Sequence, residues 1–282
     1  MLRKKYLQLF LIVLVACQTI TAVKKTVSYD SLKTQLTNIL SNNVCGKFSI
    51  YVEDLSSGKW MGINEDERYN AWSLLKVPIM VTVLKKVELK KFSLDTKISL
   101  KGKQYDTYAL QPIEKISDNS ATVKTLIERL ITLSDNTASA ALAGLFTADE
   151  FQQNLFALGL PRAPPDKPKN YLPLISPKQY ANMLRSLYYS KYLKKQYCQL
   201  VLSLLSKTIY DSQIKKSLPS KIKVAHKVGF NAGCGEFHDC GIVYLPDRPY
   251  IISVMSAGST REEADKVISS ISKIVYEYFE KK

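Results

Sequence analysis

The chain has 282 residues, of which 46% are hydrophobic and 23% are charged, and its formal net charge is +15. This composition is ordinary for a globular protein, and the length suffices for one large domain or two closely packed lobes. The lysines are scattered without interleaved aromatic residues, so we expect anionic surfaces other than nucleic acid as neighbours. Because His226 and His238 are the only histidines, no spacing indicates zinc, and we expect no metal or other cofactor.

The first 22 residues resemble an export signal. MLRKK is basic, and YLQLFLIVLVA is an apolar stretch of 11 residues, too short to span a bilayer. The segment LVAC (14–17) resembles a bacterial lipobox, in which Cys17 would carry a lipid anchor, while cleavage after Ala22 is the alternative. We therefore predict a signal segment at 1–22 and an exported protein, either periplasmic or held at the membrane as an envelope lipoprotein.

Apolar periodicity predicts a helix over residues 29–42. FSIYVEDLSSGKWMGI (48–63) alternates apolar and polar residues around Ser-Ser-Gly, which predicts a two-stranded hairpin. AWSLLKVPIM (71–80) predicts a helix on which Ser73 and Lys76 share one face. Residues 120–215 are mostly helical in pattern, interrupted by a proline-rich loop at 161–173.

Strand patterns return at KIKVAHKVGF (221–230), CGIVYL (240–245) and YIISVMSAG (250–258). A final helix is predicted after Thr260, whose side chain would cap it. This order predicts an α+β fold, in which helices flank an antiparallel sheet and an all-helical lobe is inserted in the middle of the chain. A functional site is expected between the two lobes.

Four cysteines follow the signal segment: Cys45, Cys198, Cys234 and Cys240. Cys234 and Cys240 flank GEFHD (235–239), which we interpret as a hairpin loop. Export permits disulfides, so a bridge between these two is one alternative. Free cysteines that behave as small hydrophobic residues are the other.

Three short motifs carry chemistry. Ser73 and Lys76 form an SxxK motif, and Ser-Asp-Asn occurs at both 117–119 and 134–136. The first Ser-Asp-Asn precedes SATVKTLIERLI and has the composition of a helix N-terminus. The second interrupts two apolar helical stretches without a glycine or proline. Lys-Val-Gly (227–229) then lies on a predicted strand.

SxxK, SDN and a KTG-like triplet, in this order, resemble the class A β-lactamases and penicillin-binding serine hydrolases. The resemblance runs from about residue 28 to 280 and is carried by ERYNAWSLLKVPI, TVKTLIERLITLSDNTASA, KVAHKVG and HDCGIVYLPDRPY. It implies a catalytic domain at 28–280 with the β-lactamase/transpeptidase fold. It also implies a serine hydrolase that acts on C–N amide bonds, needs no cofactor and takes a β-lactam or a peptidoglycan-derived small substrate. We expect a monomer.

The residue types suit acyl transfer. The Ser73 hydroxyl becomes a nucleophile when a base removes its proton, and Lys76 can do so only when neutral. A desolvated site and the second ammonium of Lys227 would both lower the pKa of Lys76. The backbone N–H groups of Ser73 and Phe230 could form an oxyanion hole.

The resemblance implies further roles. Ser134 would relay the proton to the departing nitrogen, and Asn136 would bind the amide side chain of the substrate. Lys227, with Gly229, would help to bind the substrate carboxylate. For Asp135 we expect a bracing role through backbone hydrogen bonds. For the two histidines we expect packing or hydrogen bonding rather than acid–base catalysis.

The sequence departs from the family pattern at three places. The loop that carries a water-activating Glu in class A enzymes has none here; Asp166 and Asn170 keep the spacing, and Asp166 is either that base or a solvated loop residue. In the family, a Thr or Ser and, in many class A enzymes, an Arg bind the substrate carboxylate. Here Val228 stands in place of the Thr or Ser, and Cys240 stands in place of the Arg. Acylation is therefore predicted to be intact and deacylation weak. A D-alanyl-D-alanine peptidase, a non-turnover penicillin-binding sensor and a vestigial envelope lipoprotein remain alternatives.

Overall fold

The structure, a computed structural model, describes residues 28–41, 44–101, 116, 119–164, 166–168, 171–172 and 174–281. The predicted signal segment 1–22 with Cys17 therefore lies outside the described residues. The helices are α1 (Tyr29–Ser41), α2 (Lys76–Glu88), α3 (Val123–Thr132), α4 (Asn136–Ala143), α5 (Ala148–Ala157), α6 (Pro177–Tyr188), α7 (Lys195–Leu205) and α8 (Arg261–Glu280), with the 3₁₀-helices η1 (Trp72–Leu75) and η2 (Ala232–Cys234).

A five-stranded antiparallel sheet is built from both ends of the chain. Its strands are β1 (Lys47–Asp54), β2 (Trp60–Ile63), β5 (Lys223–Asn231), β6 (Glu236–Tyr244) and β7 (Tyr250–Ala257), in the order β2-β1-β7-β6-β5. Strands β1 and β2 form the predicted hairpin, with Glu53 paired to Trp60 beside the turn. The register of β1 against β7, from Lys47–Ala257 to Asp54–Tyr250, joins the N-terminal hairpin to the C-terminal strands.

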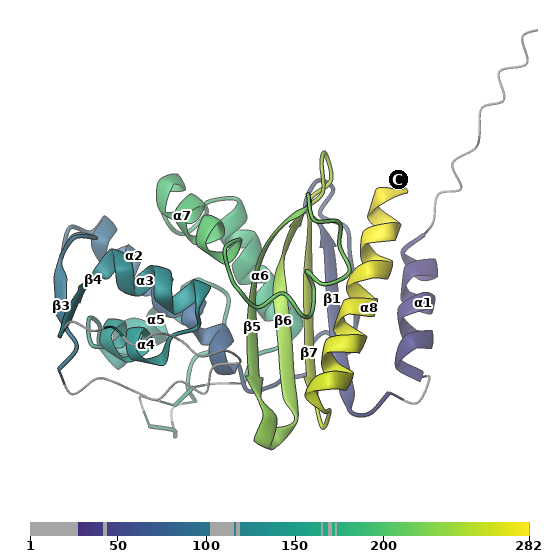
Figure 1. Cartoon of the computed structure of the whole chain (residues 1–282), viewed down its shortest axis with the longest axis horizontal. Helices are drawn as coiled ribbons and strands as arrows, with labels where there is room; N and C mark the ends of the chain where they lie inside the picture. The colour runs from purple at the N-terminus through teal and green to yellow at the C-terminus, as the bar shows by residue number, and fades with distance from the viewer. Residues whose placement is uncertain are drawn as a thin grey trace, which may run out of the picture.

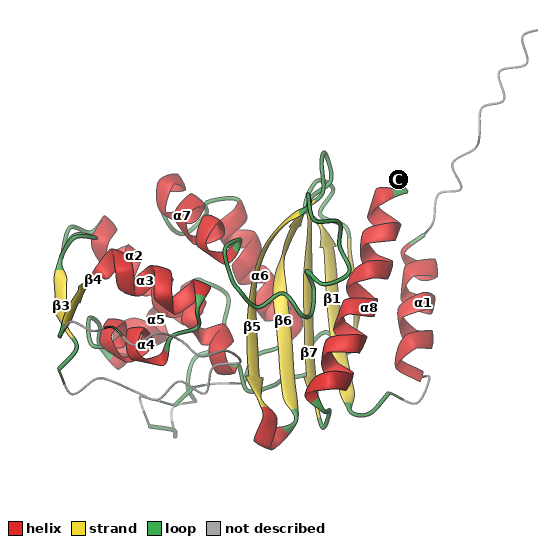
Figure 2. Ribbon diagram, viewed as in Figure 1, coloured by secondary structure: helices red, strands yellow, loops and turns green. Residues whose placement is uncertain are grey.

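Each face of the sheet is covered by helices, as Figures 1 and 2 show. Side chains alternate along a strand, so neighbouring residues belong to different cores: Ile251 packs toward the helical lobe and Ile252 toward α1 and α8. Thr260 caps α8 by accepting a hydrogen bond from the Glu263 backbone N–H at 3.2 Å, as predicted. Burial on both faces explains the long apolar runs of the C-terminal strands.

The helical lobe contains α2 to α5 and lies to one side of the sheet in Figure 1, with α6 and α7 between the two. It also contains a small antiparallel pair that the sequence did not indicate, β3 (Lys97–Ser99) and β4 (Ser120–Thr122). Helix α3 begins directly after β4, and Thr122 caps it by accepting from the Thr125 backbone N–H at 3.1 Å. The first Ser-Asp-Asn is therefore not the cap, and Ser117 and Asp118 lie outside the described residues.

The expected hairpin loop at 235–239 is wrong. Of these five residues, only Gly235 lies in the turn between β5 and β6. Glu236 to Asp239 form the first half of β6, and all four are buried. Their polar side chains suggested a loop, but each finds a hydrogen-bond partner from a distant part of the chain.

This architecture confirms the predicted α+β fold with an antiparallel sheet, flanking helices and an inserted helical lobe. None of the helices within the described ranges combines the length and apolarity needed to cross a membrane.

Candidate active site

Ser73 lies in η1, which packs directly against β5. A Cβ atom on Gly229 would lie 2.8 Å from the Ala71 carbonyl oxygen and 2.9 Å from Leu74 Cγ, closer than a real Cβ approaches other atoms. Glycine at this position is therefore required for the strand and η1 to touch. The contact brings Phe230, the next residue of β5, and Ser73 to the same cavity.

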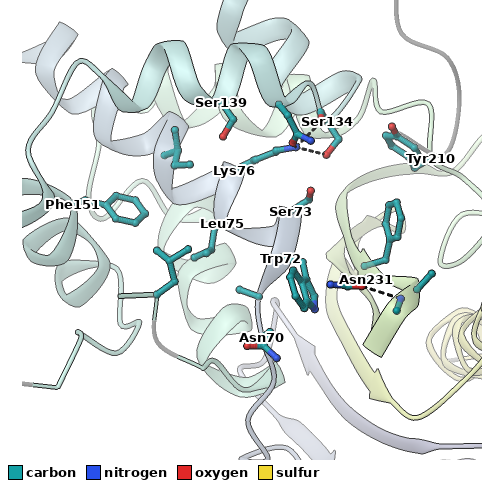
Figure 3. A pocket seen from close by; sticks show the side chains of 17 residues that line it. Asn70, Trp72, Ser73, Leu75, Lys76, Ser134, Ser139, Phe151, Tyr210 and Asn231 are labelled. Carbon is teal, nitrogen blue, oxygen red and sulfur yellow. Dashed lines mark hydrogen bonds between the residues drawn. The ribbon is translucent and has the colours of Figure 1, made fainter. Parts of the chain in front are cut away.

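Lys76 begins α2 one turn after Ser73, and its amine is directed at the turn between α3 and α4. Its Nζ donates to Ser134 Oγ at 3.0 Å and to Asn136 Oδ1 at 2.7 Å, and also to the Ser134 carbonyl oxygen. Ser134 has a φ of +55°, which lets its carbonyl and its hydroxyl face the same amine. Figure 3 shows the Ser73 hydroxyl pointing toward Lys76 and Ser134.

Lys227 approaches Ser134 from the sheet side. Its Nζ donates to Ser134 Oγ at 3.1 Å and to the Val228 carbonyl oxygen at 2.9 Å. The amine also lies 5.6 Å from the ring centroid of Tyr210, whose hydroxyl donates to the Leu133 carbonyl oxygen at 2.9 Å. Two lysines from different lobes thus meet at one serine hydroxyl.

Both amines are buried, and burial disfavours their charged forms. Desolvation lowers the pKa of Lys76 to about 8, although the carboxylate of Asp135 opposes the shift. Desolvation also lowers the pKa of Lys227 well below its ordinary value, and the charge of Lys76 acts in the same direction. A neutral amine is therefore accessible near neutral pH, and for Lys76 the cause is the expected desolvation.

Asp135 braces the turn, as predicted. Its Oδ1 accepts from the backbone N–H groups of Thr137 at 2.8 Å and Ala138 at 3.2 Å, which caps α4, and its Oδ2 accepts from Arg129 Nε at 2.6 Å. These bonds fix the backbone on which Ser134 and Asn136 are presented to Lys76.

A cavity of about 920 Å³ lies between the lobes. Its walls combine the predicted polar residues with apolar side chains from both lobes: Asn70, Ala71, Trp72, Ser73, Leu75, Lys76, Ile79, Ser134, Asn136, Ser139, Phe151, Leu172, Tyr210, Phe230, Asn231, Ala232 and Gly233. Sequence reasoning missed Trp72, Phe151 and Tyr210. Only Trp72, which adjoins the SxxK motif, carried a local signal that could have found it.

Val228 and Cys240, two of the residues at which the sequence departs from the family pattern, do not supply a carboxylate-binding group to the cavity. Val228 is buried, and its cross-strand neighbour is Asp239. Cys240 is fully buried beside Lys227, and it accepts a hydrogen bond from Ser253 Oγ at 2.9 Å. Neither Val228 nor Cys240 is part of the cavity wall, and the same holds for Gly229 and for Lys227, which is fully buried.

Asp166 does not reach the cavity either. Its side chain is 73% exposed and pairs with Lys167 at 3.6 Å. Asn170 lies outside the described residues. The structure therefore agrees with a solvated loop aspartate.

The remaining candidates are structural. Cys234 and Cys240 are both free, so the bridged alternative is wrong; Cys234 is exposed, and the Cys240 thiol lies inside the sheet. His226 Nδ1 lies 2.8 Å from Asp239 Oδ1, and His238 Nε2 donates to the Asn70 carbonyl oxygen at 2.9 Å, which confirms hydrogen bonding for both histidines. In the described part of the chain, no cluster of three or more His, Cys, Asp or Glu could hold a metal ion.

The two-lobe fold, with an SxxK serine and two buried lysines at the junction of the lobes, is that of the class A β-lactamase-like serine hydrolases. The model of the β-lactamase enzyme family matches residues 31–279, and the chain belongs to this family.

Two curated relatives cover most of the chain. β-Lactamase SME-1 of Serratia marcescens is 23% identical over 83% of this chain and 85% of its own length. β-Lactamase VEB-1 of Pseudomonas aeruginosa is 24% identical over 92% of this chain and 94% of its own. Among solved structures, an acyl-enzyme complex of a PBP-A variant with penicillin G superposes with a TM-score of 0.79 at 22% identity, covering 90% of this chain and 97% of that one.

Proposed function

We propose that this β-lactamase-like protein is an active-site-serine hydrolase that is acylated at Ser73 by β-lactams or peptidoglycan-like amides and is deacylated slowly. The observation that carries the proposal is the convergence of Lys76 Nζ and Lys227 Nζ on Ser134 Oγ, at 3.0 and 3.1 Å, in the cavity that Ser73 lines. The penicillin G adduct of the structurally similar PBP-A variant supports the same choice of substrate.

In this proposal neutral Lys76 takes the proton of the Ser73 hydroxyl while Oγ attacks the carbonyl carbon of the substrate. The negative charge that develops on the carbonyl oxygen is stabilised by the backbone N–H groups of Ser73 and Phe230. The proton then passes from Lys76 through Ser134 Oγ to the departing nitrogen as the C–N bond breaks. The acyl group remains on Ser73 as an ester.

The substrate is held by the residues around this centre. Asn136 accepts from Lys76 through Oδ1, so its Nδ2 group is the atom that would donate to the amide carbonyl of the acyl side chain. Lys227 and Gly229, on β5 at the edge of the sheet, would border the carboxylate end of the substrate. Because Val228 has no hydroxyl and Cys240 is buried, Lys227 would bind that carboxylate with little help from its neighbours.

The decisive experiment follows the intact mass of the protein with time after addition of a penicillin. We expect an adduct on wild type, none on Ser73→Ala, and unchanged circular dichroism for the variant. Ser73 is half-buried and contributes little packing, so the variant should fold. Labelling of Ser73→Ala at another residue would contradict the assignment.

The lifetime of the adduct separates the alternatives. Turnover of penicillin with a transient adduct indicates a β-lactamase, and a persistent adduct indicates a sensor or a peptidase of the penicillin-binding type. The exposure of Asp166 favours a persistent adduct, and hydrolysis of a D-alanyl-D-alanine peptide would then identify the peptidase. No adduct at all would leave a vestigial envelope protein.

We also propose that residues 1–22 direct export and that 28–280 form the catalytic domain, as a monomer. If Cys17 is lipidated, detergent extracts the protein from cells, osmotic shock does not, and Cys17→Ser blocks its processing or releases it. A soluble mature protein that begins at Val23 would instead establish cleavage after Ala22.

A further inference from the structure

A buried carboxylate lies behind the segment that carries Ser73. Glu236, the first residue of β6, is only 7% exposed. It accepts a hydrogen bond from Trp72 Nε1 at 2.6 Å and from Asn70 Nδ2 at 3.1 Å and 3.3 Å to its two oxygens. Asn70 and Trp72 line the cavity and Glu236 does not, so these two residues link Glu236 to the cavity.

The backbone of Trp72 is unusual. Its φ is +47°, in the left-handed region, which aromatic residues rarely adopt and which costs roughly 1–3 kcal/mol. Such a conformation persists only where the surroundings hold it. Trp72 directly precedes Ser73, so this conformation sets the direction in which the Ser73 Cα–Cβ bond leaves the chain.

A second residue of β6 holds the same segment. His238 lies two residues after Glu236 and therefore on the same face of the sheet. Its Nδ1 accepts from the Ser256 backbone N–H at 3.2 Å, which leaves Nε2–H to donate to the Asn70 carbonyl oxygen at 2.9 Å. Desolvation lowers the pKa of His238 to about 4, so this histidine is neutral near pH 7. Asn70 is thus held through its carbonyl by His238 and through its side chain by Glu236.

We propose that Glu236 is a positioning residue for acylation: its carboxylate holds the Trp72 indole and the Asn70 amide so that Ser73 Oγ faces Lys76 and Ser134. The inference rests on the proposed function and adds to it a residue 163 positions away in the sequence. Hydrogen bonds to a carboxylate are stronger than those to a neutral group. The loss of this anchor therefore releases Trp72 toward ordinary backbone angles and turns the serine away from its base.

Two substitutions of Glu236 remove its hydrogen bonds to different degrees. Glu236→Gln keeps the shape of the side chain and an oxygen that both donors can share, but it removes the negative charge, and its NH₂ group replaces the second oxygen that Asn70 Nδ2 approaches at 3.3 Å, so both hydrogen bonds become weaker. Glu236→Ala removes both acceptors and leaves the indole N–H and the Asn70 amide without this partner. The matched control is Glu53→Gln, because Glu53 is also buried, at 2% exposure, and accepts from Arg185 and Tyr51 at 2.9 Å, but neither of these two partners lines the cavity.

The first readout is the rate of Ser73 acylation by a fluorescent penicillin over a range of concentrations. This gives the maximum acylation rate and the dissociation constant of the non-covalent complex separately. We expect Glu236→Ala to lower the maximum rate about 10²-fold, as a displacement of about 1 Å would do, with a smaller loss in Glu236→Gln and an unchanged dissociation constant. Glu53→Gln should lose thermal stability and keep its acylation rate.

The second readout is the fluorescence of Trp72. The chain has two tryptophans, so Trp60→Phe leaves Trp72 as the only indole. In that background Glu236→Ala and Glu236→Gln should shift the Trp72 emission, and Glu53→Gln should not.

The two readouts distinguish this inference from the proposed function. If wild type forms no adduct, the proposed function fails, and the Trp72 emission still decides whether Glu236 holds Trp72. If wild type is acylated and both Glu236 variants react at the wild-type rate, or bind more weakly at an unchanged maximum rate, the positioning role is wrong. If Glu236→Ala does not fold, Glu236→Gln decides alone.

Discussion

At the scale of single residues, the site brings two buried amines to one hydroxyl, and burial disfavours the charged form of each amine. Lys76 Nζ donates to three acceptors, two on Ser134 and one on Asn136, which uses every proton of an ammonium. None of the hydrogen bonds among the described residues joins Lys76 Nζ to Ser73 Oγ. Loss of one proton would free a lone pair on Nζ without dismantling the other two bonds. Under the proposed function this arrangement is a resting state, which becomes reactive when Lys76 loses a proton.

Acylation should consequently depend on pH with a definite sign. The pKa of Lys76 is lowered to about 8, so the neutral base is the minor form below that value and the major form above it. We expect the second-order rate constant of acylation to rise almost tenfold per pH unit between about pH 6 and 7.5, and to level off above about pH 8.5. The measurement is stopped-flow acylation by a fluorescent penicillin across this range.

Lys76→Ala is the control for this profile, and we expect it to be slower by about 10²–10⁴-fold, the contribution typical of a positioned base, and flat over the same range. A profile that is flat in wild type, or a loss of only a few-fold in Lys76→Ala, would return Lys76 to the role of a buried side chain that packs.

At the scale of secondary structure, the position of Ser73 depends on how closely β5 approaches η1. The closest atom to a Cβ on Gly229 is the backbone oxygen of Ala71 at 2.8 Å, so no side-chain rotation can make room for a methyl group. The strand and the 3₁₀-helix would have to separate. That separation would also move Phe230 away from Ser73, and with it one proposed donor of the oxyanion hole.

Gly229→Ala should therefore lower the free energy of unfolding by about 1–3 kcal/mol, a typical cost of overpacking, and reduce acylation far more than this destabilisation explains. Gly241→Ala is a matched control, because a Cβ there meets Ala225 O at 2.6 Å and His226 Cβ at 2.4 Å, within the sheet and away from η1. Urea denaturation and penicillin labelling at a temperature where both variants are folded test the contrast. Equal losses of labelling in the two variants would show that η1 is not the element affected.

At the scale of the whole molecule, the parts that were predictable are those with a regular local pattern. Alternation around β1 and β2, the apolar strand patterns of β5 and β7 and the apolar stripe of α8 indicated the sheet and its covering helix. The pair β3–β4 was not predictable, because each strand has three residues and little apolar character.

The candidate site, too, was predictable only in part. The order of three motifs indicated Ser73, Lys76, Ser134 and Lys227, and the structure places them around one cavity or directly beneath it. The polar run Glu236–Asp239 was misinterpreted as a loop, because its partners are distant in sequence: Trp72 is 164 residues from Glu236. A buried polar side chain and a solvated one look alike until the fold supplies the partner.

Deacylation depends on whether the proline-rich loop brings a general base to the cavity between the two lobes. Hydrolysis of the acyl-enzyme would rely on a loop carboxylate, on Lys76 recovered as a base or on unassisted water. Among the described residues of that loop Asp166 is the only carboxylate, and it is 73% exposed and outside the cavity wall. Absence of a positioned general base typically costs about 10²–10⁴-fold in rate. We therefore expect the penicillin adduct on Ser73 to persist, with turnover far below that of an efficient β-lactamase.

Two substitutions of one residue test this expectation. Asp166→Asn should leave both the acylation rate and the lifetime of the adduct unchanged, because a solvated carboxylate contributes to neither step. Asp166→Glu, which adds one methylene, should also fail to shorten the lifetime, since the side chain starts outside the cavity. Rapid hydrolysis of a chromogenic cephalosporin by wild type, lost in Asp166→Asn, would instead require the loop to close over the acyl-enzyme and make the aspartate its base.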